Sequence, residues 1–197
     1  MNTPINAITR PFRIEPLTLE QIRMLYRERL TRDFPPDELK PLSRIERALS
    51  RGEYTCYGAM EGGEILAYAF FVISGRRALF DYYAVARDLR DRGIGSRFIR
   101  ALIEGPLSNM DCVLLEVDDP DRATGAEAVL REKRLSFYLR NGLTDTGVRA
   151  EVYQVWYRIL ALPVGDALSP EDVRHIYSDL YHTVLPAELY DRWVDIE

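Results

Sequence analysis

Hydrophobic and polar positions repeat with two different periods along this chain, and the changes between them predict the order of its elements. Alternating or continuous apolar runs rich in β-branched and aromatic residues indicate strands, and apolar residues three and four positions apart indicate helices. The resulting order is β-α-α-β-β-β-α-β-α-β-β, followed by a helical tail. The predicted strands cover residues 13–16, 53–60, 65–74, 77–86, 111–117, 143–146 and 150–160, and the predicted helices cover 19–33, 37–50, 93–104, 126–141 and the region from 170 onwards.

Cap and linker residues set the ends of these elements. Thr18 and Ser169 are N-cap residues, and Pro41 interrupts the helix expected over 37–50. A linker at 163–166 separates an expected main domain, residues 1–163, from a C-terminal helical extension, residues 164–197. An apolar stripe on this extension predicts that it docks on the domain or on a partner subunit. The stripe consists of Tyr177, Leu180, Tyr181, Val184 and Leu185.

Residues 79–102 combine a buried strand, a tight basic turn and an amphipathic helix. Glycines at the mouth of a helix let the backbone approach a ligand, and the free N–H groups of the first turn bind phosphate oxygens. Arginines in the turn add positive charge. We therefore predict a pyrophosphate cradle, the alternative being an ordinary strand-to-helix connection. The cradle consists of Arg90, Asp91, Arg92, Gly93, Ile94, Gly95 and Ser96.

The glycine spacing is neither the dinucleotide-binding G-x-G-x-x-G nor a Walker loop. The pattern Arg-x-x-Gly-x-Gly, after a strand ending in Ala84-Val85, resembles the GNAT superfamily of acyl-CoA-dependent N-acetyltransferases. The resemblance covers residues 13–160 and implies an α+β fold, with a mixed, mostly antiparallel sheet and helices on both faces. It also implies acetyl-CoA as the cofactor, in a slot where strands 77–86 and 112–117 splay apart. Backbone contacts to the pantetheine arm would come from Ala84, Val85 and Ala86.

The segments VLLEV at 113–117 and SFYLRNGL at 136–143 are similar to a GNAT signature of the form LEV … LY-x-x-x-G-F. In that signature the Glu can act as base and the Tyr as acid, which implies Glu116 and Tyr138 here. Leu143 replaces the usual Phe, the stretch between Glu116 and Tyr138 is longer, and the Asn often found after the strand is absent. The alternatives are core packing for Tyr138 and a solvated strand edge for Glu116.

Asp81 is a competing candidate for the base. It is a carboxylate inside the apolar strand segment LFDYYAV, where burial raises the pKa of a carboxyl group toward the working range of a base. Its alternative is a structural carboxylate bonded by a neighbouring hydroxyl or amide. The sequence leaves open which carboxylate is the base.

Two segments are candidates for the walls of an acceptor site. Residues 34–38 contain two prolines, which suits a stiff, shaped segment, although an inter-helix connector would look the same. Residues 118–124 lie opposite, and their acidic sequence DDPD would favour a cationic amine unless these charges are only solvated.

Composition narrows the function classes. The chain has 197 residues, 47% of them hydrophobic, and a net charge of −5, which argues against a general nucleic-acid binder. Cys56 and Cys112 lie in apolar runs and indicate buried thiols, and with two histidines no metal site is expected. The start of the chain carries no apolar signal-peptide core, and no run of 18 apolar residues indicates a membrane span. We expect a cytoplasmic protein.

Together these features predict a GNAT-type N-acetyltransferase that moves an acetyl group from acetyl-CoA directly to a primary amine. The expected partner is a small-molecule or peptide amine, and no nucleic acid or membrane partner is expected. Assembly into a homodimer is possible. The alternative is a non-catalytic acyl-CoA-binding or protein-interaction domain on the same fold. The sequence specifies neither the acceptor nor the acyl length.

Overall fold

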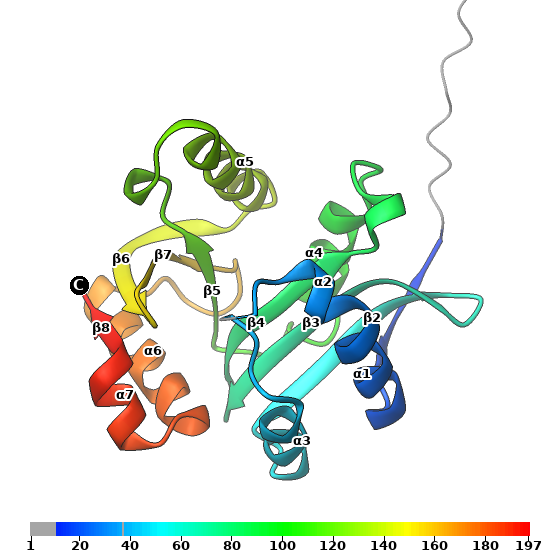
Figure 1. Ribbon diagram of the computed structural model, residues 1–197, viewed down its shortest axis with the longest axis horizontal. Coiled ribbons are helices and arrows are strands. Elements are labelled where there is room, and N and C mark those ends of the chain that lie inside the picture. The colour runs from blue at the N-terminus through cyan, green and yellow to red at the C-terminus, as the bar shows by residue number, and fades with distance from the viewer. Residues whose placement is uncertain (1–10, 37) are drawn as a thin grey trace, which may run out of the picture.

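The computed structural model describes residues 11–36 and 38–197. In this part of the chain, eight strands form one sheet in the order β1-β2-β3-β4-β5-β7-β6-β8 (Figure 1). β4 and β5 are parallel, and all other neighbouring strands are antiparallel. The predicted α+β class is therefore confirmed. The strands are β1 (Arg13–Pro16), β2 (Tyr54–Glu61), β3 (Glu64–Ser74), β4 (Arg77–Val85), β5 (Cys112–Asp118), β6 (Thr144–Val152), β7 (Val155–Ala161) and β8 (Val194–Ile196).

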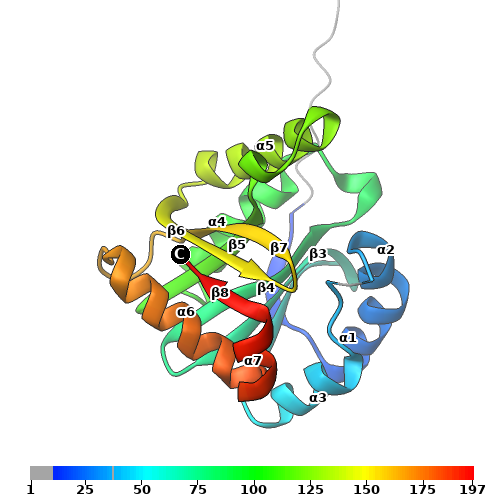
Figure 2. The same ribbon diagram turned by 60° about the vertical axis from the view of Figure 1, so that its left-hand side comes forward.

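Helices cover both faces of the sheet, as Figure 2 shows. α1, α3 and α6 pack on one face, where Tyr68 and Phe70 of β3 are fully buried. α4 and α5 pack on the other, against Ala69 and Phe71 of the same strand. The alternation along β3 places successive side chains in two separate cores. The helices are α1 (Leu19–Leu25), η1 (Tyr26–Leu30), α2 (Thr31–Asp33), α3 (Leu42–Ser50), η2 (Arg87–Leu89), α4 (Ile94–Glu104), η3 (Pro120–Arg122), α5 (Gly125–Arg140), α6 (Pro170–Val184) and α7 (Ala187–Trp193).

Both predicted N-cap residues, Thr18 and Ser169, cap their helices. Thr18 and Gln21 form a capping box at the start of α1, and Ser169 and Asp172 form another at the start of α6. The helix expected over 37–50 was predicted too long, because α3 begins only after Pro41. A proline has no backbone N–H to donate and restricts the residue before it, so the helix starts beyond it.

The last two predicted strands, 143–146 and 150–160, have the wrong boundaries. A hairpin turn at Tyr153-Gln154 separates β6 from β7, and Val152 pairs with Val155 across it. Both turn residues have positive φ, 49° and 69°, as a two-residue hairpin loop requires, but neither is a residue type that signals such a turn. The supposed break at 147–149 is a register irregularity within β6.

The C-terminal segment docks on the sheet, as its apolar stripe predicted. Tyr177 and Leu180 of α6 are fully buried in the same core as α1 and α3. The prediction of a wholly helical tail was wrong at its end, because β8 follows α7 and extends the sheet by pairing with β6. Within the described ranges, no helix has the length and apolar character needed to cross a membrane.

The sheet opens between its two parallel strands. β4 and β5 pair from Arg77 opposite Cys112 as far as Phe80 opposite Leu115, and no further. β4 continues to Val85 and β5 to Asp118 without pairing to each other, and the two ribbons diverge in Figure 1. The splay implied by the family resemblance is confirmed. It leaves one backbone edge of β4 without a strand partner beyond Phe80.

Candidate active site

A cleft of about 1170 Å³ lies at this opening. Its walls come from the end of β4, the start of α4, the connection between α2 and α3, and α5. Asp81, Glu116 and Tyr138, the three candidate acid–base residues, all line it. From the predicted cradle and the preceding strand, the cleft is lined by Ala84, Val85, Arg90, Asp91, Gly93, Gly95 and Ser96.

The start of α4 forms an open helix terminus in this cleft. Gly93 is the N-cap residue with φ of 75°, a backbone conformation that favours glycine, and no side chain caps the helix. The N–H groups of the first turn therefore have no partner within the helix. Gly93 and Ser96 bring this turn to the cleft, where its free N–H groups suit an anionic ligand.

Gly95 permits a close approach between α4, α5 and β4. A Cβ atom at this position would lie 3.2 Å from the Phe137 ring, 3.3 Å from the Tyr83 hydroxyl and 3.4 Å from a Val85 methyl carbon. The Tyr83 hydroxyl in turn donates a hydrogen bond of 2.7 Å to the Gly95 carbonyl. The cradle is thus tightly packed behind the helix mouth.

Three of the predicted cofactor-binding residues do not line the cleft: Arg92 and Ile94 of the cradle, and Ala86 of the predicted pantetheine contacts. Ile94 and Ala86 are buried in the core beneath α4, and the N–H of Ala86 donates to the Leu66 carbonyl. Arg92 is exposed outside the cleft. Arg90 lies closer: its Nε donates to the Val85 carbonyl at 3.2 Å and its Nη2 to Asp33 at 3.1 Å.

Asp33 ties the end of α2 to the cradle. Its side chain is 5% exposed and pairs with both Arg87 and Arg90. The Tyr68 hydroxyl also donates to it, at 3.0 Å. This carboxylate, which sequence reasoning did not single out, fixes the arginine beside the open helix terminus.

Asp81 follows Phe80, the last residue of β4 that pairs with β5, and its carboxylate accepts hydrogen bonds from two sides. Lys40 donates to its Oδ1 and the Tyr54 hydroxyl to its Oδ2. Its side chain is 6% exposed. Burial alone would lower the pKa of Lys40, but the attraction and hydrogen bond of Asp81, together with Tyr82 and Glu116, outweigh burial and raise this pKa, so Lys40 stays charged over the whole physiological range. Both oxygens of Asp81 are engaged.

Glu116 occupies the equivalent position on β5 and is held differently. Tyr177 and Tyr181 of α6 both donate to the same oxygen, Oε1, the latter at 2.5 Å. Burial raises the pKa of Glu116, while the two hydroxyls and Lys40 lower it and Asp81 raises it. No donor among the described residues binds Oε2, so one oxygen of Glu116 remains available at the cleft.

Tyr138 reaches the cleft from the last turn of α5. It is 8% exposed, and its ring packs edge-on against Tyr83 and Phe137, at 6.3 and 5.2 Å between centroids. Burial raises the pKa of Tyr138 to about 12, so the hydroxyl keeps its proton at neutral pH. No hydrogen-bond partner of this hydroxyl lies within the described ranges.

One of the two predicted acceptor walls lines the cleft. Phe34, Pro35 and Glu38 do so, and Asp37 lies outside the described residues. Phe34 packs edge-on against Tyr82, at 4.9 Å between ring centroids. The Tyr82 hydroxyl donates to the Glu38 carbonyl at 3.0 Å. The connection between α2 and α3 is therefore anchored on β4.

The expectation that the acidic loop 118–124 attracts a cationic amine is not supported. Asp119 is buried and bonded to Arg158 at 2.7 Å, which also pairs with Asp121 at 2.5 Å. Asp118 pairs with Arg134. The loop's charges are neutralised within the protein, and of its residues only Asp118 lines the cleft.

Sequence reasoning missed the partners of the two carboxylates. Tyr177 and Tyr181 were seen as part of an apolar stripe, although their spacing of four residues also places two hydroxyls on one face. Lys40 is one of only two lysines in a chain with 24 arginines, and this rarity could have marked it as a residue with a specific role. Nothing in the sequence pointed to Tyr54.

Solved structures share this architecture. A Bacteroides thetaiotaomicron protein assigned to the GNAT acetyltransferases superposes with a TM-score of 0.68 at 20% identity, covering 86% of this chain and 96% of that one. The ribosomal-protein-S18-alanine N-acetyltransferase from Escherichia coli gives 0.52 at 21% identity, over 79% and 96%. A Bacillus subtilis acetyltransferase in complex with CoA gives 0.54 at 17% identity, over 80% and 99%. These likenesses show the fold.

Among curated proteins, none matches this sequence. The sequence model of the acetyltransferase (GNAT) family does, over residues 19–128. This match covers more than half of the chain and includes the open helix terminus, Asp81 and Glu116, while Tyr138 and α6 lie beyond it. The chain belongs to the GNAT acetyltransferase family.

Proposed function

We propose that this chain is an N-acetyltransferase that moves an acetyl group from acetyl-CoA to a primary amine, by direct transfer in a ternary complex. One observation carries the proposal. The open helix terminus of α4, the two carboxylates at the sheet opening and Tyr138 all line a single cleft. One cleft therefore contains both a site for a phosphate-bearing acyl donor and a site for proton transfer.

The residues present fit acetyl-CoA, whose thioester supplies the acetyl group. The first turn of α4 offers N–H groups for the pyrophosphate, and Arg90 stands beside it. The unpaired edge of β4 at Ala84 and Val85 offers backbone groups to the amides of the pantetheine arm. The likeness to the Bacillus subtilis acetyltransferase in complex with CoA is consistent with this assignment.

We assign the base to Glu116 and the acid to Tyr138. The amine nitrogen forms a bond to the acetyl carbon while the carbon–sulfur bond breaks. Glu116 takes the ammonium proton through its available Oε2, and Tyr138 gives its proton to the departing sulfur. The second proton, which the nitrogen loses as it becomes an amide, returns to Tyr138 and restores its hydroxyl. Asp81 is the weaker candidate for the base because Lys40 and Tyr54 occupy both of its oxygens.

Direct transfer is supported by the state of the two cysteines. Cys56 and Cys112 are both buried. Burial raises the pKa of Cys56 well above its ordinary value and that of Cys112 to about 11, so both remain thiols at neutral pH. A thiol is a poor nucleophile compared with its thiolate. Neither cysteine is therefore suited to carry an acetyl group.

The test measures thiol release from acetyl-CoA over a panel of primary amines, with calorimetry of CoA binding. We expect micromolar to millimolar CoA binding, turnover on at least one amine, intersecting initial-velocity lines and no acetylated protein by mass spectrometry. CoA binding without turnover on any amine would favour the non-catalytic alternative. Absence of CoA binding would overturn the proposal.

A further inference from the structure

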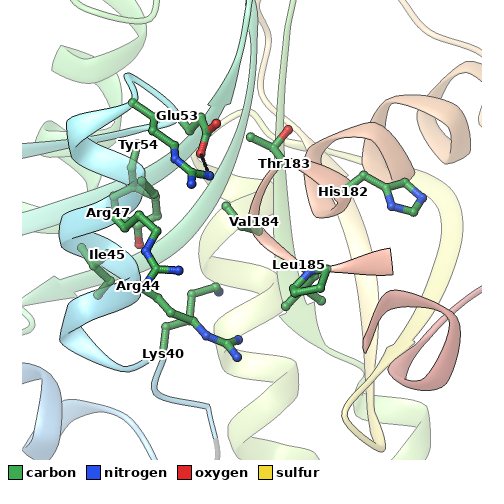
Figure 3. Close-up of a pocket in the computed structure, with 13 residues that line it drawn as sticks. Lys40, Arg44, Ile45, Arg47, Glu53, Tyr54, His182, Thr183, Val184 and Leu185 are labelled. Atoms are coloured by element: carbon green, nitrogen blue, oxygen red, sulfur yellow. Dashed lines mark ion pairs between the residues drawn. The ribbon is translucent and has the colours of Figure 1, made fainter. Parts of the chain in front are cut away.

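A second pocket, of about 350 Å³, lies between α3 and the end of α6 (Figure 3). It adjoins the main cleft, because Lys40, Arg44 and Leu185 line both. In Figure 3, Arg44, Arg47 and Lys40 extend into the space that faces Val184 and Leu185. The acyl-transfer chemistry proposed above uses none of the arginines here.

The pocket is strongly basic although the whole chain is acidic. Arg44 and Arg47 lie three residues apart on α3, and Arg51, four residues further, is its C-cap residue, so the three lie on one side of the helix. Arg51 lies 3.8 Å from Glu53, the one carboxylate that lines the pocket. For Arg44 and Arg47, no carboxylate partner lies among the described residues.

Such a cluster opposes helix stability, because like charges at this spacing repel one another. On the side of α3 that faces α1, charges are paired, because Glu46 of α3 accepts a hydrogen bond of 2.6 Å from Arg23 of α1. The arginines that face the pocket lack such pairing. An anion that entered the pocket would relieve their repulsion, and guanidinium groups bind a carboxylate through paired N–H donors.

Lys40 and Tyr54 form the boundary between this pocket and the carboxylates of the main cleft. Both line the pocket, and both donate to Asp81, which lies on the cleft side. Glu116 lies close enough for its pKa to respond to Lys40 and Asp81. The positively charged pocket at Arg44 and Arg47 thus adjoins the negatively charged carboxylates at the proposed site of proton transfer.

We propose that the acceptor is an amino acid or a related molecule that carries a carboxylate as well as its primary amine. Its carboxylate binds Arg44 and Arg47, and its amine extends toward Glu116. Because Arg44 lines both cavities, it marks the point where the acceptor passes from one to the other. The assignment of the amine end rests on the proposed function, whereas the carboxylate end rests on the pocket alone.

The first test is binding to the CoA-saturated protein, measured by calorimetry. The ligands are glycine, β-alanine, 4-aminobutyrate, 6-aminohexanoate and a set of α-amino acids, each compared with its amide. We expect at least one acid to bind at least tenfold more tightly than its amide. Arg44→Gln and Arg47→Gln should each remove that preference. Arg13→Gln, at an exposed position of the edge strand β1, removes the same charge outside both cavities and should keep it.

Two outcomes would overturn the inference. Equal binding of acids and amides would show that the arginines do not recognise a carboxylate. Equal binding of butyrate and 4-aminobutyrate would show an anion site unrelated to the acceptor amine.

Turnover separates this inference from the proposed function. Acetylation of amines with no preference for a carboxylate would leave the proposed function intact and refute the inference. Carboxylate-selective binding without acetylation of any amine would support the pocket and refute the proposed function. We expect kcat/KM for the preferred acid to fall at least tenfold in Arg47→Gln, while kcat/KM for its amide stays unchanged.

Discussion

Tyr181 donates its phenolic hydrogen to Oε1 of Glu116 at 2.5 Å, although the two residues lie 65 positions apart in the sequence. Tyr177, one turn earlier on α6, donates to the same oxygen. Burial raises the pKa of Glu116 and these hydrogen bonds lower it. A helix beyond the matched family segment therefore adjusts the proton affinity of the proposed base.

Removing one donor should shift the pH dependence of the reaction. In Tyr181→Phe the pKa of Glu116 rises, because the lost hydrogen bond favoured the charged form. A base must be deprotonated to act, so the ascending limb of the rate should move to higher pH by roughly one unit, equivalent to about 1.4 kcal/mol. Steady-state rates between pH 5 and 9 measure this. Tyr190→Phe, which loses a hydroxyl bonded to Ser178 instead, should leave the profile in place.

The two carboxylates should respond differently to amide substitution. Glu116→Gln should abolish the ascending limb and slow transfer by roughly 10²-fold, since it removes the proton acceptor. Asp81→Asn should mainly destabilise the protein, because Lys40 loses its charged partner. We expect a loss of about 2 kcal/mol, seen as a fall in Tm of roughly 4–8 °C. A pH profile flattened in Asp81→Asn and normal in Glu116→Gln would move the base to Asp81.

The stability of Glu116→Gln gives a check that needs no substrate. The folded-state pKa of Glu116 lies above its unfolded value, so the folded state retains this proton to higher pH. The contribution is present below the unfolded pKa and is lost as pH rises through the folded pKa. Denaturant unfolding should show this decline in the parent, and Glu116→Gln should lack it.

Tyr138→Phe tests the proposed acid. The substitution removes only a hydroxyl and keeps the ring contacts with Tyr83 and Phe137. Acetyl transfer should slow by roughly 10²-fold, with CoA affinity nearly unchanged. Stopped-flow measurement of thiol release, with calorimetry of CoA binding, separates the two quantities. Tyr57→Phe, on β2 and away from the cleft, should retain the parent rate, and an active Tyr138→Phe would assign this tyrosine to packing.

Ser96→Glu tests the phosphate site without backbone strain. Glycine substitutions are less informative, because Gly93 has positive φ and a side chain at Gly95 would press on Phe137. Ser96 is in the first turn of α4, where a negative charge stabilises the helix but opposes a pyrophosphate. CoA affinity should fall roughly tenfold to hundredfold while Tm is kept or raised. Ser96→Gln, of equal size but uncharged, should bind CoA far better than Ser96→Glu.

Truncation tests the expected division at residue 163. A chain of residues 1–163 lacks α6, whose five buried side chains contribute about 10 kcal/mol, which is comparable to the whole stability of a typical domain. We therefore expect it to be insoluble or to show no cooperative unfolding. A chain ending at Trp193 loses only β8 and should unfold cooperatively with a modestly lower Tm. A stable 1–163 fragment would show that the extension is dispensable for folding.

The fold was accessible from the sequence because most of its elements have local signals. Thr18 and Ser169 cap their helices as expected, and the apolar run around Phe80 marks a central strand. The turn at Tyr153-Gln154 had no such signal, since its positive φ values come from strand pairing and not from residue preference. Local reasoning failed where tertiary pairing determines the backbone.

The candidate site was accessible only in part, for a related reason. Gly93 and its neighbours form a contiguous motif, so the helix terminus could be predicted from adjacent residues. The environment of Asp81 and Glu116 is built from the connection between α2 and α3, from β2 and from α6, and no sequence spacing relates these segments. The neutralisation of Asp119 by Arg158 likewise depends on a contact between distant segments.

The opening of the sheet gives α6 a mechanical role. Backbone hydrogen bonds between β4 and β5 end at Phe80, so beyond it the two halves of the sheet lack a shared ladder. α6 contacts β3 and β4 on one side of this split and β6 on the other. α6 therefore links the two halves of the sheet where they share no backbone hydrogen bonds, and its packing on both sides limits how far they can separate.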